Sequence, residues 1–110
     1  NIEIQQEVTV MKTVKIDEKL ESLLHELEFK DAKELMKDSL ITEILYRISV
    51  FSEEIRRFEN KYRKNLMEFK KEYESGEEDY TRYEDLMAWE FAKHGKDYWN
   101  KKLEELKSAL

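Results

Sequence analysis

The chain has 110 residues, a formal net charge of -6, no cysteine, no proline and only two glycines. The lack of cysteine excludes a disulfide framework and a thiolate metal site, and the acidic balance argues against a protein that coats nucleic acid with its whole surface. Charged residues make up 42% of the chain, which is typical of long exposed helices, and we expect one small, mainly α protein. Because no apolar run reaches the roughly 18 residues of a membrane span and no signal peptide is recognisable, we expect a cytoplasmic protein with no membrane partner.

Residues 2–16 alternate between apolar and polar side chains. This period of two, rich in β-branched residues, predicts one N-terminal β-strand, and it is the only strand that the sequence predicts. Its apolar side carries Val8, Val10, Val14 and Ile16. Because a lone strand leaves backbone groups unpaired, we expect it to pair with the same strand of a second copy as a dimer ribbon.

A short helix and then a long helix are predicted after the strand. Asp17 is a suitable N-cap, and the leucines that follow it recur at helical spacing. Asp31 and Glu34 form a capping box that starts the long helix, whose apolar stripe is typical of a helix laid along another helix. The stripe consists of Ile41, Ile44, Ile48, Phe51, Ile55, Phe58 and Tyr62. We expect Ile41, Ile44 and Ile48 to contribute to the dimer.

Local signals divide the C-terminal half into further helices. A second capping box, Asn65 with Glu68, predicts a kink or restart near residue 64, and Gly76 predicts a stop. A third box, Thr81 with Glu84, predicts a last helical arm that reaches the C-terminus with an interruption at His94-Gly95. The chain is therefore expected to consist of a strand-helix-helix dimerisation region, residues 1–50, and a helical partner-binding region, residues 51–110.

The order of elements over residues 8–48, "VTVMKTVKIDEKLESLLHELEFKDAKELMKDSLITEILYRI", resembles the ribbon-helix-helix family of dimeric DNA-binding proteins. Many antitoxins of toxin-antitoxin pairs belong to this family, whose paired strands enter the major groove of DNA. The resemblance implies DNA as a partner, contacted through the polar side of the strand. That side carries Thr9, Met11, Thr13 and Lys15.

Residues 53–106 resemble small prokaryotic proteins that are often presumed antitoxins. The resemblance lies in a phenylalanine-glutamate pair, a lysine-tyrosine pair, an acidic gap, a tryptophan-glutamate pair and a late tyrosine-tryptophan pair before leucine repeats. The matching positions are Phe58, Glu59, Lys61, Tyr62, Phe69, Asp85, Leu86, Trp89, Glu90, Tyr98, Trp99, Leu103 and Leu106. Where such proteins often have glycine after the tyrosine, this chain has Arg63-Lys64.

Charge is distributed unevenly along the C-terminal half. Residues 56–71 carry a net +5, and residues 72–90 carry a net -7. The two runs either pair with each other as solvated helix faces, or the acidic run meets a basic partner. Both interpretations are open from the sequence.

Enzymatic chemistry has little support in the composition. The two histidines, His25 and His94, lack the spacing of a zinc or di-iron helix, and there is no Gly-rich phosphate loop. We therefore expect no catalytic residues, no metal ligands and no cofactor.

Aromatic residues are concentrated between residues 77 and 106. Trp89, Trp99 and Leu103 fit one helix face and could be core, whereas other aromatics do not fit that face and lie beside acidic residues, as interface anchors do. The expected partner-binding residues are Tyr80, Tyr83, Leu86, Trp89, Phe91, Tyr98 and Trp99. The resemblances imply an antitoxin-like protein that binds a basic toxin; the alternative is a helical structural or adaptor protein with coiled-coil-like homo-oligomeric packing and no nucleic-acid role.

Overall fold

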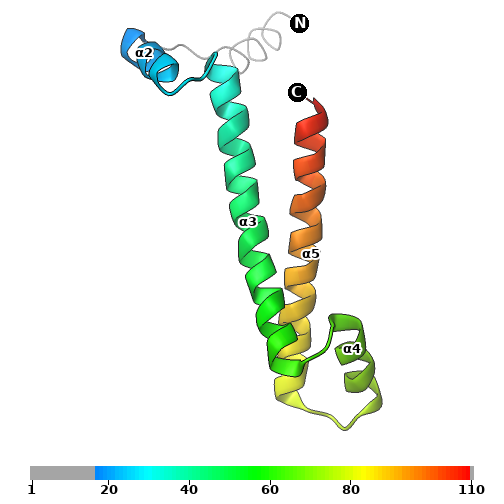
Figure 1. Ribbon diagram of the computed structural model, residues 1–110. Helices are drawn as coiled ribbons and strands as arrows, with labels where there is room; N and C mark the ends of the chain where they lie inside the picture. The colour runs from blue at the N-terminus through cyan, green and yellow to red at the C-terminus, as the bar shows by residue number, and fades with distance from the viewer. Residues whose placement is uncertain (1–16, 110) are drawn as a thin grey trace, which may run out of the picture. The chain divides into compact units, whose positions relative to one another are not determined.

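The computed structural model describes residues 17–109, which form four helices and no strand (Figure 1). Their bounds are α2 Glu18–Glu26, α3 Ala32–Tyr62, α4 Leu66–Ser75 and α5 Tyr80–Ala109. The chain divides into two compact units between Leu40 and Ile41, ahead of the boundary expected at residue 50. Each unit is compact by itself.

The predicted strand-then-helices fold is corrected to an all-helical one for the described part of the chain. Alternating apolar and polar residues make a strand only where a second strand completes the hydrogen-bond ladder, and residues 17–109 offer no such strand. The predicted strand and its residues lie outside the described residues. These are the dimer positions Val8, Val10, Val14 and Ile16 and the DNA-reading positions Thr9, Met11, Thr13 and Lys15.

The first unit confirms two predicted helix starts. The backbone N–H of Leu20 donates to the Asp17 carboxylate at 2.9 Å, so Asp17 caps α2. Glu34 N–H donates to Asp31 at 2.9 Å, and the Glu34 carboxylate in turn accepts from the backbone N–H of Lys30. The side chain therefore reaches one residue further back than in the usual capping box. These local bonds start α3 independently of any tertiary contact.

The second unit is a hairpin of two antiparallel helices, the C-terminal part of α3 and the whole of α5, with the short α4 between them in the chain (Figure 1). Ring contacts show the register, because Phe51 meets Phe91 and Phe58 meets Trp89. α4 packs against α5 where the hairpin closes. The densest core lies at this closed end and consists of Phe58, Phe69, Leu86 and Trp89.

The predicted break near residue 64 is confirmed. α3 ends at Tyr62, Arg63 takes the left-handed conformation with φ of 56°, and Asn65 caps α4 by accepting from the N–H of Glu68 at 2.9 Å. The substitution of Arg63-Lys64 for glycine does not prevent a sharp turn. It costs free energy instead, since an L-residue in the left-handed region is strained by about 1–2 kcal/mol.

Relieving this strain should stabilise the hairpin. We expect Arg63→Gly to be more stable than Arg63→Ala by about 1 kcal/mol, because both remove the charge and only glycine adopts the left-handed conformation without strain. Urea denaturation of the two variants measures the difference. Equal stability of the two would contradict it.

The start and the continuity of α5 differ from prediction. Asp79, not Thr81, caps the helix, accepting from the N–H of Arg82 at 3.1 Å. The predicted interruption at His94-Gly95 is wrong, because α5 runs unbroken from Tyr80 to Ala109. One glycine costs a helix interior only about 1 kcal/mol, which packing can offset. Here a Cβ at Gly95 would lie 2.5 Å from the Phe51 ring, so glycine permits the close approach of α3 and α5.

A double-mutant cycle tests this role of Gly95. In the wild type, Gly95→Ala should destabilise the hairpin by about 1–2 kcal/mol, since the methyl group displaces the Phe51 ring. In a Phe51→Ala background the same change should stabilise it by up to about 1 kcal/mol, because only the gain in helix propensity remains. Thermal unfolding of the four proteins gives the coupling, and the same effect in both backgrounds would show that the ring contact is unimportant.

Candidate functional site

An aromatic core fixes the closed end of the hairpin. Trp89 is 1% exposed, its ring stacks on Phe58 at 5.5 Å between centroids, and Phe69 of α4 lies 5.4 Å away. Tyr62, the last residue of α3, completes the cluster at 4.2 Å from Phe69. Aromatic pairs of this kind contribute beyond their buried area, so three helices are joined here into one rigid platform.

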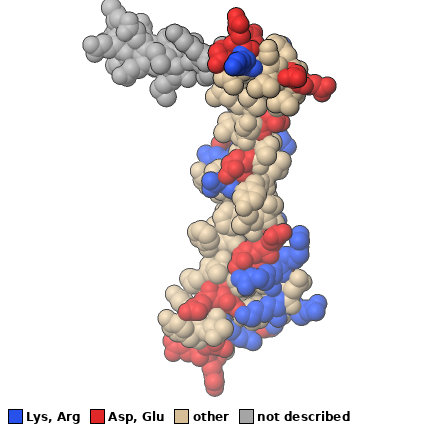
Figure 2. Space-filling view, turned by 90° about the vertical axis from the view of Figure 1, so that its left-hand side faces the viewer, with Lys and Arg blue, Asp and Glu red and all other residues tan. Residues whose placement is uncertain are grey.

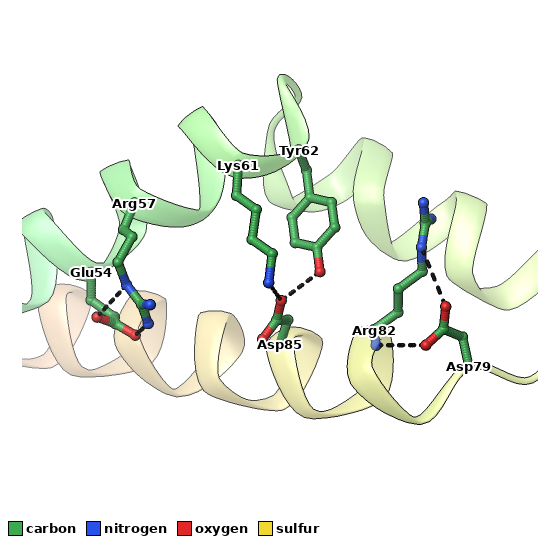
Figure 3. Close-up of polar contacts among 7 residues, drawn as sticks. All are labelled: Glu54, Arg57, Lys61, Tyr62, Asp79, Arg82 and Asp85. Atoms are coloured by element: carbon green, nitrogen blue, oxygen red, sulfur yellow. Dashed lines mark hydrogen bonds and ion pairs between the residues drawn. The ribbon is translucent and has the colours of Figure 1, made fainter.

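A polar cluster lies beside this core, where the end of α3 meets the start of α5 (Figure 3). The Lys61 ammonium lies 2.6 Å from the Asp85 carboxylate, and the Tyr62 hydroxyl donates to the same oxygen at 2.5 Å. Arg82 places its guanidinium over the Tyr62 ring at 5.7 Å and near Asp79. Asp85 thus ties two consecutive α3 residues to α5.

The surroundings of Asp85 change its pKa in a definite direction. Partial burial alone would raise the pKa, but hydrogen bonds from Lys61 and Tyr62 and the attraction of nearby cations outweigh it and lower the pKa below its usual value. Burial, and then the bond to Asp85, raises the pKa of Tyr62, so the phenol stays a neutral donor. The cluster is a structural clamp, since Lys61 and Tyr62 both bind one carboxylate oxygen of Asp85.

Because the pKa of Asp85 is lowered in the folded chain, its stabilising effect is present above the pKa of an unfolded aspartate, about 3.9, and is lost as the pH falls below it. We expect Asp85→Asn to cost about 1–2 kcal/mol at pH 7 and almost nothing near pH 2. Thermal melts across this range measure it. Asp97→Asn is the matched control, because its 2.9 Å pair with Lys93 is exposed and should contribute little at either pH.

Three bases of the basic run pair with acids of the acidic run, as one interpretation of the sequence predicted. Lys61 pairs with Asp85, Lys64 with Glu72, and Lys70 with Glu90. Within the described residues, Glu77, Glu78 and Glu84 have no such partner. The hairpin neutralises part of its own charge, and of the acids in this run that it leaves unpaired, all but Glu74 of α4 lie around the start of α5.

The outer side of α5 carries a stripe of large, exposed side chains. Its members follow at spacings of three, four, four and seven residues, so they project from one side of the helix, away from the buried Leu86 and Trp89. The stripe, called here the outer stripe, consists of Tyr80, Tyr83, Met87, Phe91 and Tyr98. Tyr80 is 77% exposed and Phe91 is 70% exposed. A contiguous apolar row of this kind indicates an interaction surface, whereas single exposed apolar residues do not.

The predicted partner-binding residues divide between the two sides of α5. Leu86 and Trp89 are buried, and Trp99 is half-buried under the guanidinium of Arg47, 5.2 Å from its ring centroid. These three hold the hairpin together, whereas Tyr80, Tyr83, Phe91 and Tyr98 all belong to the outer stripe. Met87 was missed, although its position between Tyr83 and Phe91 at helical spacing was readable in the sequence.

The helical residues predicted for the dimer are partly covered within one chain. Ile44 is buried, and Ile41 and Ile48 are half-buried. Among residues 17–109 no three His, Asp or Glu side chains converge as a metal-binding group. None of the described helices combines the length and the apolar character needed to cross a membrane.

Comparisons with known proteins give no relative. No protein-family model matches the chain, and neither the curated proteins nor the solved structures yield a significant match. Together with the all-helical structure of the described residues, this overturns both resemblances, to the ribbon-helix-helix family and to presumed antitoxins. A strand-helix-helix order is a weak pattern, and the tryptophan, tyrosine and aspartate positions of the second resemblance are explained by the packing of this hairpin.

Proposed function

We propose that the chain is a protein-binding module, and not an enzyme, whose outer stripe on α5 docks onto a partner protein. The observation that supports this most directly is the row of five large apolar side chains left exposed on a helix whose other side is already packed. None of the five belongs to the buried core, although Phe91 touches Phe51 and Tyr83 touches Tyr73 at the edge of the stripe. Binding to a partner would bury these exposed side chains.

Energetics favour this surface as an interface. A few tyrosine and other aromatic anchors at the centre of a contact supply most of the binding free energy, and a polar rim supplies rate and specificity. The stripe provides Tyr80, Tyr83 and Phe91 as anchors on a rigid helix, which reduces the entropy lost on binding.

The rim defines the chemistry of the partner. Glu77, Glu78 and Glu84 lie next to the tyrosines and are not neutralised within the described residues. A partner with an apolar groove bordered by Lys or Arg would complement both parts of the surface. The described residues specify only this chemistry, so a toxin as the partner, and the antitoxin function that goes with it, stay predictions from the sequence.

Self-association is the alternative, and the charge order of α5 favours it specifically. Acids predominate near the start of the helix, whereas near its end Lys101, Lys102 and Lys107 outnumber Glu104 and Glu105, of which Glu105 pairs with Lys102. Two stripes packed antiparallel would therefore place acids against bases. This corresponds to the helical adaptor with homo-oligomeric packing, and sedimentation of the isolated chain separates it from a heterologous partner.

Site-specific photo-crosslinking in the native host tests the proposal. A photoreactive residue in place of Phe91 should crosslink to one defined protein, whereas the same residue at Leu45, which is also apolar and exposed but lies on α3, should not. Adding Tyr83→Ser should reduce the Phe91 crosslink at least about tenfold, because loss of an interface anchor commonly costs 2 kcal/mol or more.

Folding is the control for these variants. Since the stripe does not enter the core, its serine variants should melt within a few degrees of the wild type. Equal crosslinking from Leu45 and Phe91, or a defined crosslink that survives Tyr80→Ser with Tyr83→Ser, would contradict binding through the outer stripe.

A further inference from the structure

A second feature of the hairpin lies away from the outer stripe. It is an open groove of about 470 Å³ bounded by α3, the start of α4 and α5. α3 contributes residues between Ser52 and Glu59, and α5 contributes Trp89 and two lysines one turn apart. The volume is in the range of ligand sites, and the turn at Arg63 and Asn65 positions the start of α4 at one end.

The groove has an apolar floor. Ile55, Leu66 and the buried Trp89 line it, and Met67 lies at its edge with 70% of its side chain exposed. Trp89 belongs to the rigid aromatic core, so the floor is preformed. A flexible methionine beside a fixed floor suits the docking of another apolar side chain.

The walls of the groove are cationic. Arg56 projects from α3, and Lys93 and Lys96 project from α5, against a single acid, Glu59. Lys93 pairs with Asp97, but Arg56 and Lys96 have no ion-pair partner within the described residues. Lys96 is also half-buried as a residue, so part of its side chain is already covered within the hairpin.

On the α3 side of the hairpin, Lys and Arg gather above acids at the end nearest the α4–α5 turn (Figure 2). Much of the wider basic run is already paired, as Lys61, Lys64 and Lys70 show. Arg56 of the groove, like Arg63 and Lys71 elsewhere in the run, pairs with no acid within the described residues.

We propose that this groove binds an acidic, amphipathic peptide segment of a partner protein, with an apolar side chain on the Ile55–Leu66–Met67 floor and carboxylates at Arg56 and Lys96. Charge complementarity specifies the acid, and the floor specifies the apolar residue. Glu59 at the wall would repel a carboxylate placed near it, which orients the acids toward Lys96.

The openness of the walls favours a peptide over a small molecule. Arg56, Met67 and Lys93 all remain exposed, so a small ligand would keep much of its surface in water, whereas small-molecule sites cover most of their ligand. A helix laid in a groove needs only one covered side. With the outer stripe, the hairpin would then carry two binding surfaces of opposite charge preference.

Selection from a phage-displayed library of helical peptides, about four turns long, tests the proposal on the full chain. Peptides selected on the wild type should be enriched in Asp and Glu next to large apolar residues. A fluorescein-labelled selected peptide should bind Arg56→Glu/Lys96→Glu at least about tenfold more weakly. Glu59→Gln should bind it severalfold more tightly, since the repelling charge is gone.

Two controls separate the groove from charge in general and from the outer stripe. Lys101→Glu/Lys107→Glu makes the same change in net charge on the exposed surface of α5 outside the groove, and binding should stay within about twofold of wild type. In methyl NMR spectra the peptide should shift the Met67 resonance and leave that of Met87, on the outer stripe, unchanged. If the double Glu variant melts early, Arg56→Gln/Lys96→Gln replaces it.

Three outcomes would overturn the proposal. The selected pool could lack acidic enrichment, or both double variants could lose binding equally, which would mean diffuse electrostatic attraction. The third outcome concerns other polyanions. Vesicles of anionic phospholipid or a DNA duplex could lose as much affinity for the groove variants as the peptide does, and could shift the Met67 resonance equally. In that case the groove recognises a polyanion, and no peptide is needed to explain it.

Discussion

The packing of Trp89, which stacks on Phe58 of α3 and meets the tilted ring of Phe69 of α4, is the interaction on which the second unit depends. It buries the largest side chain of the core and joins three helices at one point. This contact positions both proposed binding surfaces. α5 presents the outer stripe on the side opposite Trp89, and the edge of the same cluster forms the floor of the groove.

The polar contacts near this core help to fix the register of α5 along α3. A stack of rings tolerates sliding, because dispersion depends weakly on orientation. Asp85 accepts from both Lys61 and Tyr62 near the closed end. About four turns from the closed end, Gly95 leaves room for the Phe51 ring. The register of α5 on α3 is therefore held at two separate heights. A one-residue slip would break both contacts. The positions of the exposed side chains of α5 are therefore also fixed relative to α3.

Local signals in the sequence predicted helix boundaries well, and nonlocal features could not be predicted. The caps at Asp17, Asp31 and Asn65 are bonds between residues three apart, which the local order of residues specifies, although the box predicted at Thr81 was wrong. By contrast, whether Trp89 or Phe91 is the buried residue depends on which side of α5 meets α3. The groove was not predictable either, since it unites residues 52–59, 65–67 and 89–96. Gly95 was interpreted as a break because its partner, Phe51, is distant in sequence.

The concentration of buried side chains at the closed end has a mechanical consequence. Toward the other end of the hairpin fewer side chains are buried, with Ile44 on α3 and Leu103 on α5 still 8% and 9% exposed. Separation of α5 from α3 under tension would therefore start at Ala109 and advance stepwise toward Trp89, meeting its greatest resistance last. Amide protons would record the same order as a gradient of exchange rates along α5, fastest at the C-terminal turns and slowest beside the tryptophan.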